Sequence, residues 1–303
     1  MPLPIFKSEA NKNTPHPILK KTVDTLANIK FIIGVAAGKG GVGKSTVTVN
    51  LGLALKAEGF KVGIMDTDIY GPSIRKMLPE DQSPQQKGDL IIPALSQGIK
   101  MISMAYFRKE GEASAVRAPI ANSLISHFIK NVLWGDLDFL LLDFPPGTGD
   151  IQITLSQQAR LIGAVMVTTP QEVALCDVKK AMSLFNQVKI PIIGIVENMS
   201  YYLPDEKSDP VYLFGKEGGE KLAVQSNVPF LGQIPLDPYI CQCGDLGLSI
   251  FNENSQLKTT SACAFQNLAK ELVTHVTQLE SEQKRGIGSF ELIWKEMAEV
   301  KHE

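Results

Sequence analysis

A glycine-rich segment, Gly38 to Thr46, constrains this chain more than any other part of its sequence. The segment reads Gly-Lys-Gly-Gly-Val-Gly-Lys-Ser-Thr and matches the pattern G-x-x-x-x-G-K-[ST]. It follows the apolar run 31–37 and leads into 47–55, so its context is strand, turn and helix. In that context the pattern predicts a phosphate-binding loop.

The residue types of the loop suit phosphate chemistry. Glycines allow successive N–H groups to converge on an anion, and the helix that follows adds its positive N-terminal end. Lys44 supplies a charge for the terminal phosphates, and the Ser45 hydroxyl is suited to bind Mg²⁺. The sequence therefore predicts that a nucleoside triphosphate binds along the loop, at Gly38, Lys39, Gly40, Gly41, Val42, Gly43, Lys44, Ser45 and Thr46.

Carboxylates close two of the predicted strands. Asp66 and Asp68 end the strand at 61–66, and Asp143 ends the apolar strand at 139–143. Carboxylates at strand ends beside a triphosphate hold Mg²⁺ or orient the attacking water. We therefore predict a magnesium site of Ser45, Asp66 and Asp143, and the alternative for each acid is a helix cap or turn.

Strands and helices alternate along most of the chain, which predicts one doubly wound α/β domain with a mostly parallel sheet. We place this P-loop ATPase domain at 28–285, after a loose tail with a short helix at 1–27. Residues 89–93 and 99–106 are expected to pair as a hairpin at the sheet edge. A long helix is expected at 256–284, and an amphipathic extension at 286–303.

Composition excludes several classes of partner. The net charge of −2 gives no broad basic field for nucleic acid or an anionic membrane. No apolar run approaches the roughly 20 residues that span a bilayer. Four cysteines and no recognisable signal peptide predict a cytoplasmic protein. The extension at 286–303 carries more Glu than Lys, which argues against stable membrane association.

The second lysine of the loop, Lys39, resembles that of the deviant-Walker ATPases, which include MinD, ParA and the nitrogenase iron protein. Further segments, in order, are similar to the Mrp/ApbC iron–sulfur carrier ATPases over about residues 28–255. They are Gly38 to Thr46, Asp66-Thr-Asp-Ile-Tyr-Gly-Pro-Ser73, Asp143-Phe-Pro-Pro-Gly-Thr-Gly-Asp150, Thr168-Thr-Pro-Gln-Glu-Val-Ala-Leu175, Glu197-Asn-Met-Ser-Tyr201 and Ile234-Pro-Leu-Asp-Pro238.

This resemblance implies a homodimer that binds ATP, hydrolyses it slowly and delivers a [4Fe–4S] cluster to apoproteins together with assembly factors. It implies that Lys39 reaches the partner's phosphates and that Asp68 positions the attacking water, with Lys44 as the third catalytic residue. Asn198, Pro235 and Asp237 are implied to contact adenine. On chemistry alone, a cap or turn role for Asn198 stays open.

The cysteine pattern departs from that of the family. Its Cys-x-x-Cys pair should follow Asn198-Met-Ser-Tyr201, but residues 201–208 contain no cysteine. The remaining close pair is Cys241 and Cys243, whose sulfurs would face one side if the chain were extended there. They are candidate cluster ligands, and the alternative is that they are small buried side chains.

Two other functions remain open at this point. The first is an ATP-switched positioning protein of the MinD or ParA kind, which the segments at Asp143 and Thr168 disfavour. The second is redox transfer like that of the nitrogenase iron protein, which also needs cluster cysteines. The C-terminal extension is expected to dock on protein, with Gly286 and Gly288 as a hinge.

Overall fold

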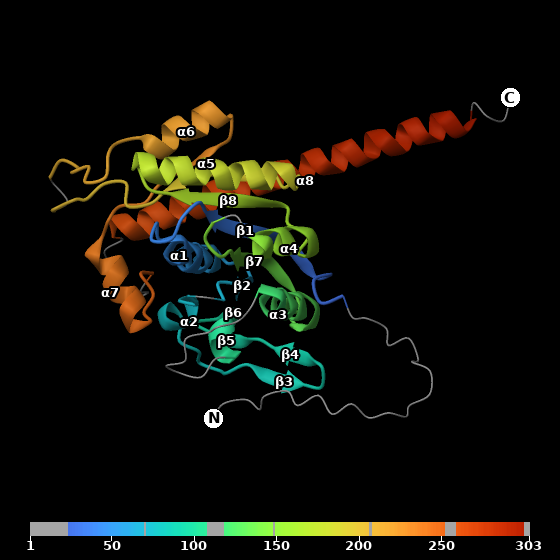
Figure 1. Ribbon diagram of the computed structural model, residues 1–303, viewed down its shortest axis with the longest axis horizontal. Coiled ribbons are helices and arrows are strands. Elements are labelled where there is room, and N and C mark those ends of the chain that lie inside the picture. The colour runs from blue at the N-terminus through green and yellow to red at the C-terminus, as the bar shows by residue number, and fades with distance from the viewer. Residues whose placement is uncertain are drawn as a thin grey trace.

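The computed structural model describes residues 24–69, 71–107, 118–147, 149–205, 208–251 and 259–299, with side chains described up to residue 284 in the last range. Within these ranges the main feature is an eight-stranded sheet with helices on both faces (Figure 1). Its strands, in spatial order, are β10 (Phe230–Gln233), β9 (Ile192–Glu197), β8 (Gly163–Thr168), β1 (Ile29–Ala37), β7 (Leu137–Asp143), β2 (Val62–Asp66), β6 (Ile99–Ser103) and β5 (Ala94–Ser96).

Two apolar layers bury the faces of this sheet. One layer joins the sheet to α1 (Lys44–Ala57), α7 (Pro238–Leu246) and α8 (Thr260–Glu299). The other joins it to α3 (Ala118–Asn131), α4 (Asp150–Gln158), α5 (Glu172–Gln187) and α6 (Gly218–Ser226). Because both faces are covered, β1, β7 and β8 are apolar along nearly their whole length. The predicted doubly wound fold is confirmed.

The strand order reverses at β1. The chain places β2, β6 and β7 on one side of β1 and β8, β9 and β10 on the other. Ligands of doubly wound sheets bind beyond the carboxyl ends of the strands at such a reversal. The glycine-rich loop leaves β1 at that point.

The edge hairpin differs from our expectation. β5 pairs with β6 across Gln97 and Gly98, which both have positive φ, as a two-residue hairpin turn requires. The strand β4 (Leu90–Ile92), expected in this hairpin, instead pairs with β3 (Gln85–Lys87) in a separate small sheet. Pro93 separates β4 from β5, and it cannot donate to a strand ladder. Two short helical turns, α2 (Ile74–Met77) and η1 (Met104–Phe107), complete this region.

The expected hinge near the C-terminus is wrong. α8 runs through Gly286 and Gly288 without interruption and extends beyond the rest of the fold (Figure 1). A glycine costs a helix only about 1 kcal/mol relative to alanine, which a long helix tolerates. The first half of α8 packs on α1 and β10, and this anchors the helix. The expected N-terminal helix lies mostly outside the described residues.

Among the helices of the described ranges, none combines the length and the apolar character needed to cross a membrane.

Candidate nucleotide-binding site

The glycine-rich loop is shaped by contacts with α5 and with the end of β9. A Cβ built on Gly38 would lie 2.1 Å from the carbonyl carbon of Asp177, so the loop touches the backbone of α5 directly. Gly43 has a φ of 81°, and a Cβ there would lie 2.2 Å from Nδ2 of Asn198. Gly43 is also the N-cap of α1 and supplies no side-chain cap, so the first N–H groups of α1 are left for an anion.

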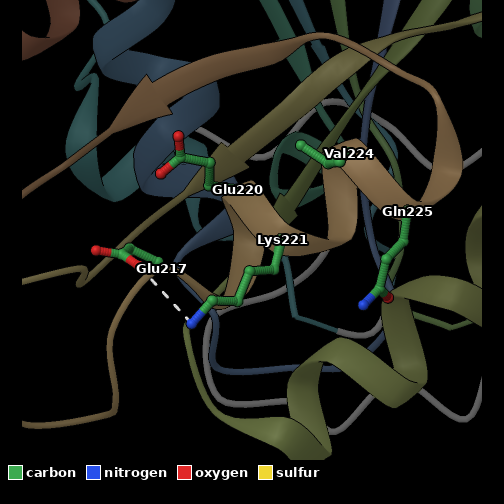
Figure 2. A pocket seen from close by; sticks show the side chains of 5 residues that line it. All are labelled: Glu217, Glu220, Lys221, Val224 and Gln225. Carbon is green, nitrogen blue, oxygen red and sulfur yellow. Dashed lines mark ion pairs between the residues drawn. The ribbon is translucent and has the colours of Figure 1, made fainter.

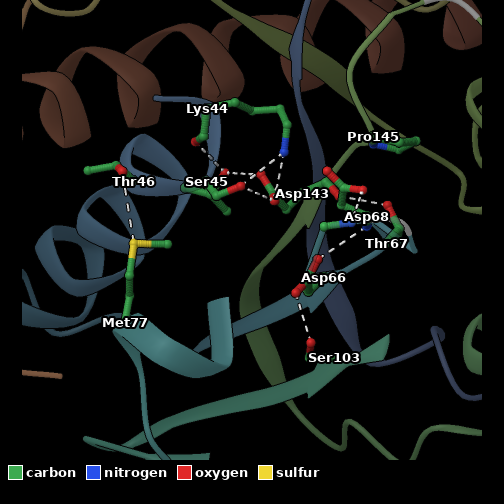
Figure 3. Close-up of polar contacts among 12 residues, drawn as sticks. Lys44, Ser45, Thr46, Asp66, Thr67, Asp68, Met77, Ser103, Asp143 and Pro145 are labelled. Carbon is green, nitrogen blue, oxygen red and sulfur yellow. Dashed lines mark hydrogen bonds and ion pairs between the residues drawn. The ribbon is translucent and has the colours of Figure 1, made fainter. Parts of the chain in front are cut away.

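Behind the loop, the side chains of Lys44 and Ser45 point at Asp143 (Figure 3), and that of Thr48 also reaches it. The Lys44 ammonium lies 2.7 Å from Oδ2 of Asp143, and Ser45 Oγ donates to the same oxygen at 2.7 Å. Thr48 Oγ1 donates to Oδ1 of Asp143, also at 2.7 Å. Asp143 is fully buried, so these partners offset the cost of burying its charge. The structure thus brings together three of the predicted site residues.

Thr48 is a residue that the sequence analysis missed. It lies one helical turn after Lys44, and its Oγ1 is also 3.0 Å from the Lys44 carbonyl oxygen, the alternative acceptor for its one hydroxyl proton. The signal was available, because residues four apart share a helix face and Lys44 was already assigned to the site.

The two predicted magnesium carboxylates end neighbouring strands. Asp66 of β2 is directly opposite Asp143 of β7 in the parallel register. Ser103 Oγ donates to Asp66 at 2.8 Å (Figure 3). Burial, and then the negative charge of Asp143, raise the pKa of Asp66 to about 7. Ser45 and Asp143 form a hydroxyl–carboxylate donor set that fits Mg²⁺, which usually takes one or two protein oxygens beside phosphate and water.

Asp68 and Lys39 lie on loops that border this site. Oδ1 of Asp68 accepts from the Gly71 backbone N–H at 3.0 Å, so the carboxylate stabilises the turn after β2. Its role with water stays a prediction. Lys39 is half-buried and makes no ion pair with any residue of the described ranges.

The predicted adenine residues follow β9 and β10. Asn198 is buried, and its Nδ2 donates to the Val42 carbonyl oxygen at 2.8 Å, which braces the phosphate loop. Pro235 is buried beyond β10, on a segment joined to the residues after β9 by the Leu236 N–H, which donates to the Tyr201 carbonyl oxygen at 2.7 Å. Asp237 caps α7 by accepting from the Tyr239 N–H at 2.8 Å and also accepts from Ser261. Adenine contact by these residues stays a prediction.

The structure contradicts the extended conformation that we expected around Cys241 and Cys243. Both lie on α7, where residues two apart are on different sides of the helix. Cys241 is exposed and Cys243 is buried, so their sulfurs do not face one site. In the part of the chain that the structure describes, no group of three or more His, Cys, Asp or Glu side chains could hold a metal ion.

Comparison with known proteins agrees with this site. Residues 28–273 match the family model of ParA proteins described as NUBPL iron-transfer P-loop NTPases. The chain belongs to this family. An iron-sulfur cluster carrier protein of Synechocystis is 42% identical over 283 residues, which cover 90% of this chain and 79% of that protein. The Escherichia coli iron-sulfur cluster carrier protein is 49% identical over 210 residues, which cover 69% of this chain and 57% of that protein.

Solved structures give the same grouping. A nucleotide-binding protein of Archaeoglobus fulgidus, in complex with ADP, is 39% identical with a TM-score of 0.65, over 74% of this chain and 90% of that one. The cell division ATPase MinD of Pyrococcus furiosus is 24% identical with a TM-score of 0.57, over 81% and 99% of the two chains. The likeness to MinD extends to the fold alone, so it does not favour the positioning function.

Proposed function

We propose that this member of the NUBPL family binds and hydrolyses ATP and delivers iron–sulfur clusters to apoproteins. The observation that carries the ATPase part is the convergence of Lys44, Ser45 and Thr48 on the buried Asp143 directly behind the phosphate loop. The cluster part rests on the family and on relatives that are named iron-sulfur cluster carrier proteins.

The residues behind the loop divide the work. Without nucleotide, the buried Lys44 ammonium pairs with Asp143, and when ATP binds it pairs with the terminal phosphates instead. The ammonium therefore has an anionic partner in both states. Thr48 keeps the freed carboxylate oriented through the bond to Oδ1. When present, Mg²⁺ neutralises charge on the phosphates, and Ser45 and Asp143 would hold it. Asp68 orients the attacking water from the loop after β2.

The active form is a homodimer in which Lys39 serves the partner's nucleotide. Two observations support this. Lys39 is half-buried and makes no ion pair within the described ranges, so its ammonium is left to pair with an anion such as the phosphates of the partner's nucleotide. In addition, the exposed apolar side chains Ile120, Val173 and Leu213 all belong to segments that follow the carboxyl ends of strands, as the phosphate loop does.

The cluster is cargo. A [4Fe–4S] cluster takes four thiolates, which two identical subunits provide only with two each. Because Cys241 and Cys243 do not face one site, the chain acts in delivery as a helper that has lost its own ligands, and the thiolates come from other proteins of the assembly pathway.

Two lysine variants test the ATPase part. Lys44→Ala should weaken nucleotide binding and abolish hydrolysis. Lys39→Ala should leave binding of a fluorescent ATP analogue within about threefold of wild type but lower phosphate release at least about 100-fold, because it serves the transition state in the partner. Turnover in wild type should rise more steeply than in proportion to protein concentration. A Lys39→Ala variant with wild-type turnover would contradict the role of Lys39 in the partner's site.

The cluster part is tested separately. A [4Fe–4S] apoenzyme is incubated anaerobically with iron, sulfide and a thiol-bearing scaffold protein, with or without this chain and ATP. The chain with ATP should speed recovery of enzyme activity, and Lys44→Ala should not. Equal recovery in all mixtures would refute the delivery function.

A further inference from the structure

The last residue of β9, Glu197, is a fully buried carboxylate outside the nucleotide site. Its Oε1 accepts from Ser200 Oγ and its Oε2 from the Gly219 backbone N–H, both at 2.5 Å. Gly219 is in the first turn of α6, so the positive end of that helix also faces the carboxylate. These contacts explain how the fold accommodates a buried charge there.

The first turn of α6 is held tightly at this point. A Cβ built on Gly219 would lie 3.0 Å from Cβ of Glu197, and one on Gly218 would lie 2.6 Å from the Pro170 carbonyl oxygen. The turn is therefore fixed between the ends of β8 and β9. Glu197 and the first turn of α6 are thus in close contact through both a hydrogen bond and packed backbone.

Those residues, 208–217, form what we name the approach segment. Its Val211 pairs with Tyr202 through both backbone hydrogen bonds, at 2.8 and 2.9 Å. The two residues that donate to Glu197 flank this segment, because Ser200 is two residues before Tyr202 and Gly219 is two residues after Glu217. Val211, Tyr212 and Leu213 of this segment are exposed apolar side chains, the type that docks on another protein.

The neighbouring residue faces the other way. Asn198 donates from Nδ2 to the Val42 carbonyl oxygen of the phosphate loop at 2.8 Å, and its backbone N–H donates to Thr168 at 2.8 Å. Of two consecutive residues at the end of β9, Asn198 thus contacts the phosphate loop and Glu197 contacts the first turn of α6, which follows the approach segment. Only one peptide unit separates Asn198, which contacts Val42, from Glu197.

We propose that Glu197 is a positioning residue that couples nucleotide occupancy of the phosphate loop to the conformation of the approach segment. This inference rests on the proposed binding of ATP. The hydrogen bonds that the Glu197 carboxylate accepts come from Ser200 and Gly219, outside the phosphate loop. Because it accepts from both at once, it joins the segment after β9, where Asn198 contacts the phosphate loop, to the first turn of α6 that follows the approach segment.

Hydrogen exchange of the full-length chain tests the coupling. Peptides covering 208–219 are followed without nucleotide, with Mg²⁺–ADP and with a non-hydrolysable Mg²⁺–ATP analogue. In wild type, exchange should differ about fivefold between the nucleotide-free and nucleotide-bound states, at the lower end of typical coupling between two sites. Glu197→Gln has one acceptor oxygen and a donor NH₂, so it cannot accept both bonds. Its difference should fall below about twofold, with nucleotide affinity within about threefold of wild type.

The matched control is Glu220→Gln, the same change on an exposed residue of the first turn of α6 (Figure 2). Glu220→Gln should keep the wild-type difference in hydrogen exchange between the nucleotide-free and nucleotide-bound states. If the loss in Glu197→Gln came only from removing a negative charge near the start of α6, Glu220→Gln would lose the difference as well. Ser200→Ala, which deletes one donor and keeps the charge, should give a partial loss and replaces Glu197→Gln if that variant is unfolded.

The outcomes separate the two proposals. If wild type binds no nucleotide, the proposed function fails. If nucleotide binds and peptides 208–219 do not respond, or if the Glu197→Gln or Ser200→Ala response equals that of wild type, the coupling is refuted and the ATPase proposal stands.

Discussion

Replacing Gly38 by alanine tests the claim that the phosphate loop is positioned by direct backbone contact with α5. The new Cβ would lie 2.1, 2.2 and 2.3 Å from the carbonyl carbon of Asp177, the nitrogen of Val178 and the carbonyl oxygen of Asp177. These are backbone atoms, so no side-chain rotation relieves the overlap. Since non-bonded carbon atoms are most stable about 3.5–4.0 Å apart, the loop and α5 must separate by more than about 1 Å.

The size of the effect follows from this overlap. Overpacking of a well-packed site costs about 1–3 kcal/mol of unfolding free energy. For a domain of this size, each kcal/mol lowers the Tm by about 2–4 °C, which gives a fall of about 2–12 °C. A loop moved by about 1 Å also misplaces its phosphate-binding N–H groups, and such errors cost about 100-fold in rate.

The control is in the same loop. A Cβ built on Gly40 meets no atom within 4 Å, and its φ lies outside the left-handed region. Gly40→Ala should therefore leave the Tm unchanged or raise it slightly, because alanine has less freedom in the unfolded chain. Thermal unfolding without nucleotide compares the two variants. Equal Tm values for Gly38→Ala, Gly40→Ala and wild type would refute the close contact with α5.

Two further predictions concern Asp143 and the cysteines. Thr48→Val removes a donor to Oδ1 of the buried Asp143 and should cost about 1–3 kcal/mol of unfolding free energy, measured in urea. The control is Thr277→Val, which loses a hydroxyl bond to a carbonyl oxygen four residues earlier on the surface of α8. It should cost less than about 0.5 kcal/mol. Equal costs would refute the role of Thr48. After anaerobic reconstitution with iron and sulfide, wild type and the Cys241→Ser/Cys243→Ser double variant should contain similarly low amounts of iron. If wild type bound stoichiometric iron and the double variant did not, the helical separation of the two cysteines would be contradicted.

The parts of the site that adjoin one motif were predictable from the sequence. The position of Lys44 and Ser45 at the start of a helix follows from local rules, because the glycine pattern, the apolar strand before it and the helix after it are contiguous. The meeting of Asp66 and Asp143 also followed, since both end parallel strands at the same edge of a sheet. These inferences need only the secondary structure and the sheet topology.

The cysteine pair shows where such reasoning fails. The segment Ile240-Cys-Gln-Cys-Gly-Asp245 has no clear periodicity of apolar residues. In an extended chain its two sulfurs would lie on the same side, whereas in a helix they lie on different sides. The helix is fixed by Asp237, which caps it and bonds to Ser261 of α8, 24 residues away in sequence. That contact exists only in the folded molecule.

The chain's sequence by itself determined the doubly wound sheet and the place of the phosphate loop, because both depend on apolar periodicity and on residues close together in the chain. Only the tertiary structure decided that Asn198 braces Val42 and that Glu197 contacts α6. The contact between Asn198 and Val42 joins the segments that follow two different strands, β9 and β1, and the contact between Glu197 and Gly219 joins residues 22 apart in sequence. Which residues meet in these contacts depends on which strands are neighbours in the sheet and on how closely the glycine backbones approach other segments. Neither property can be read from a local sequence pattern.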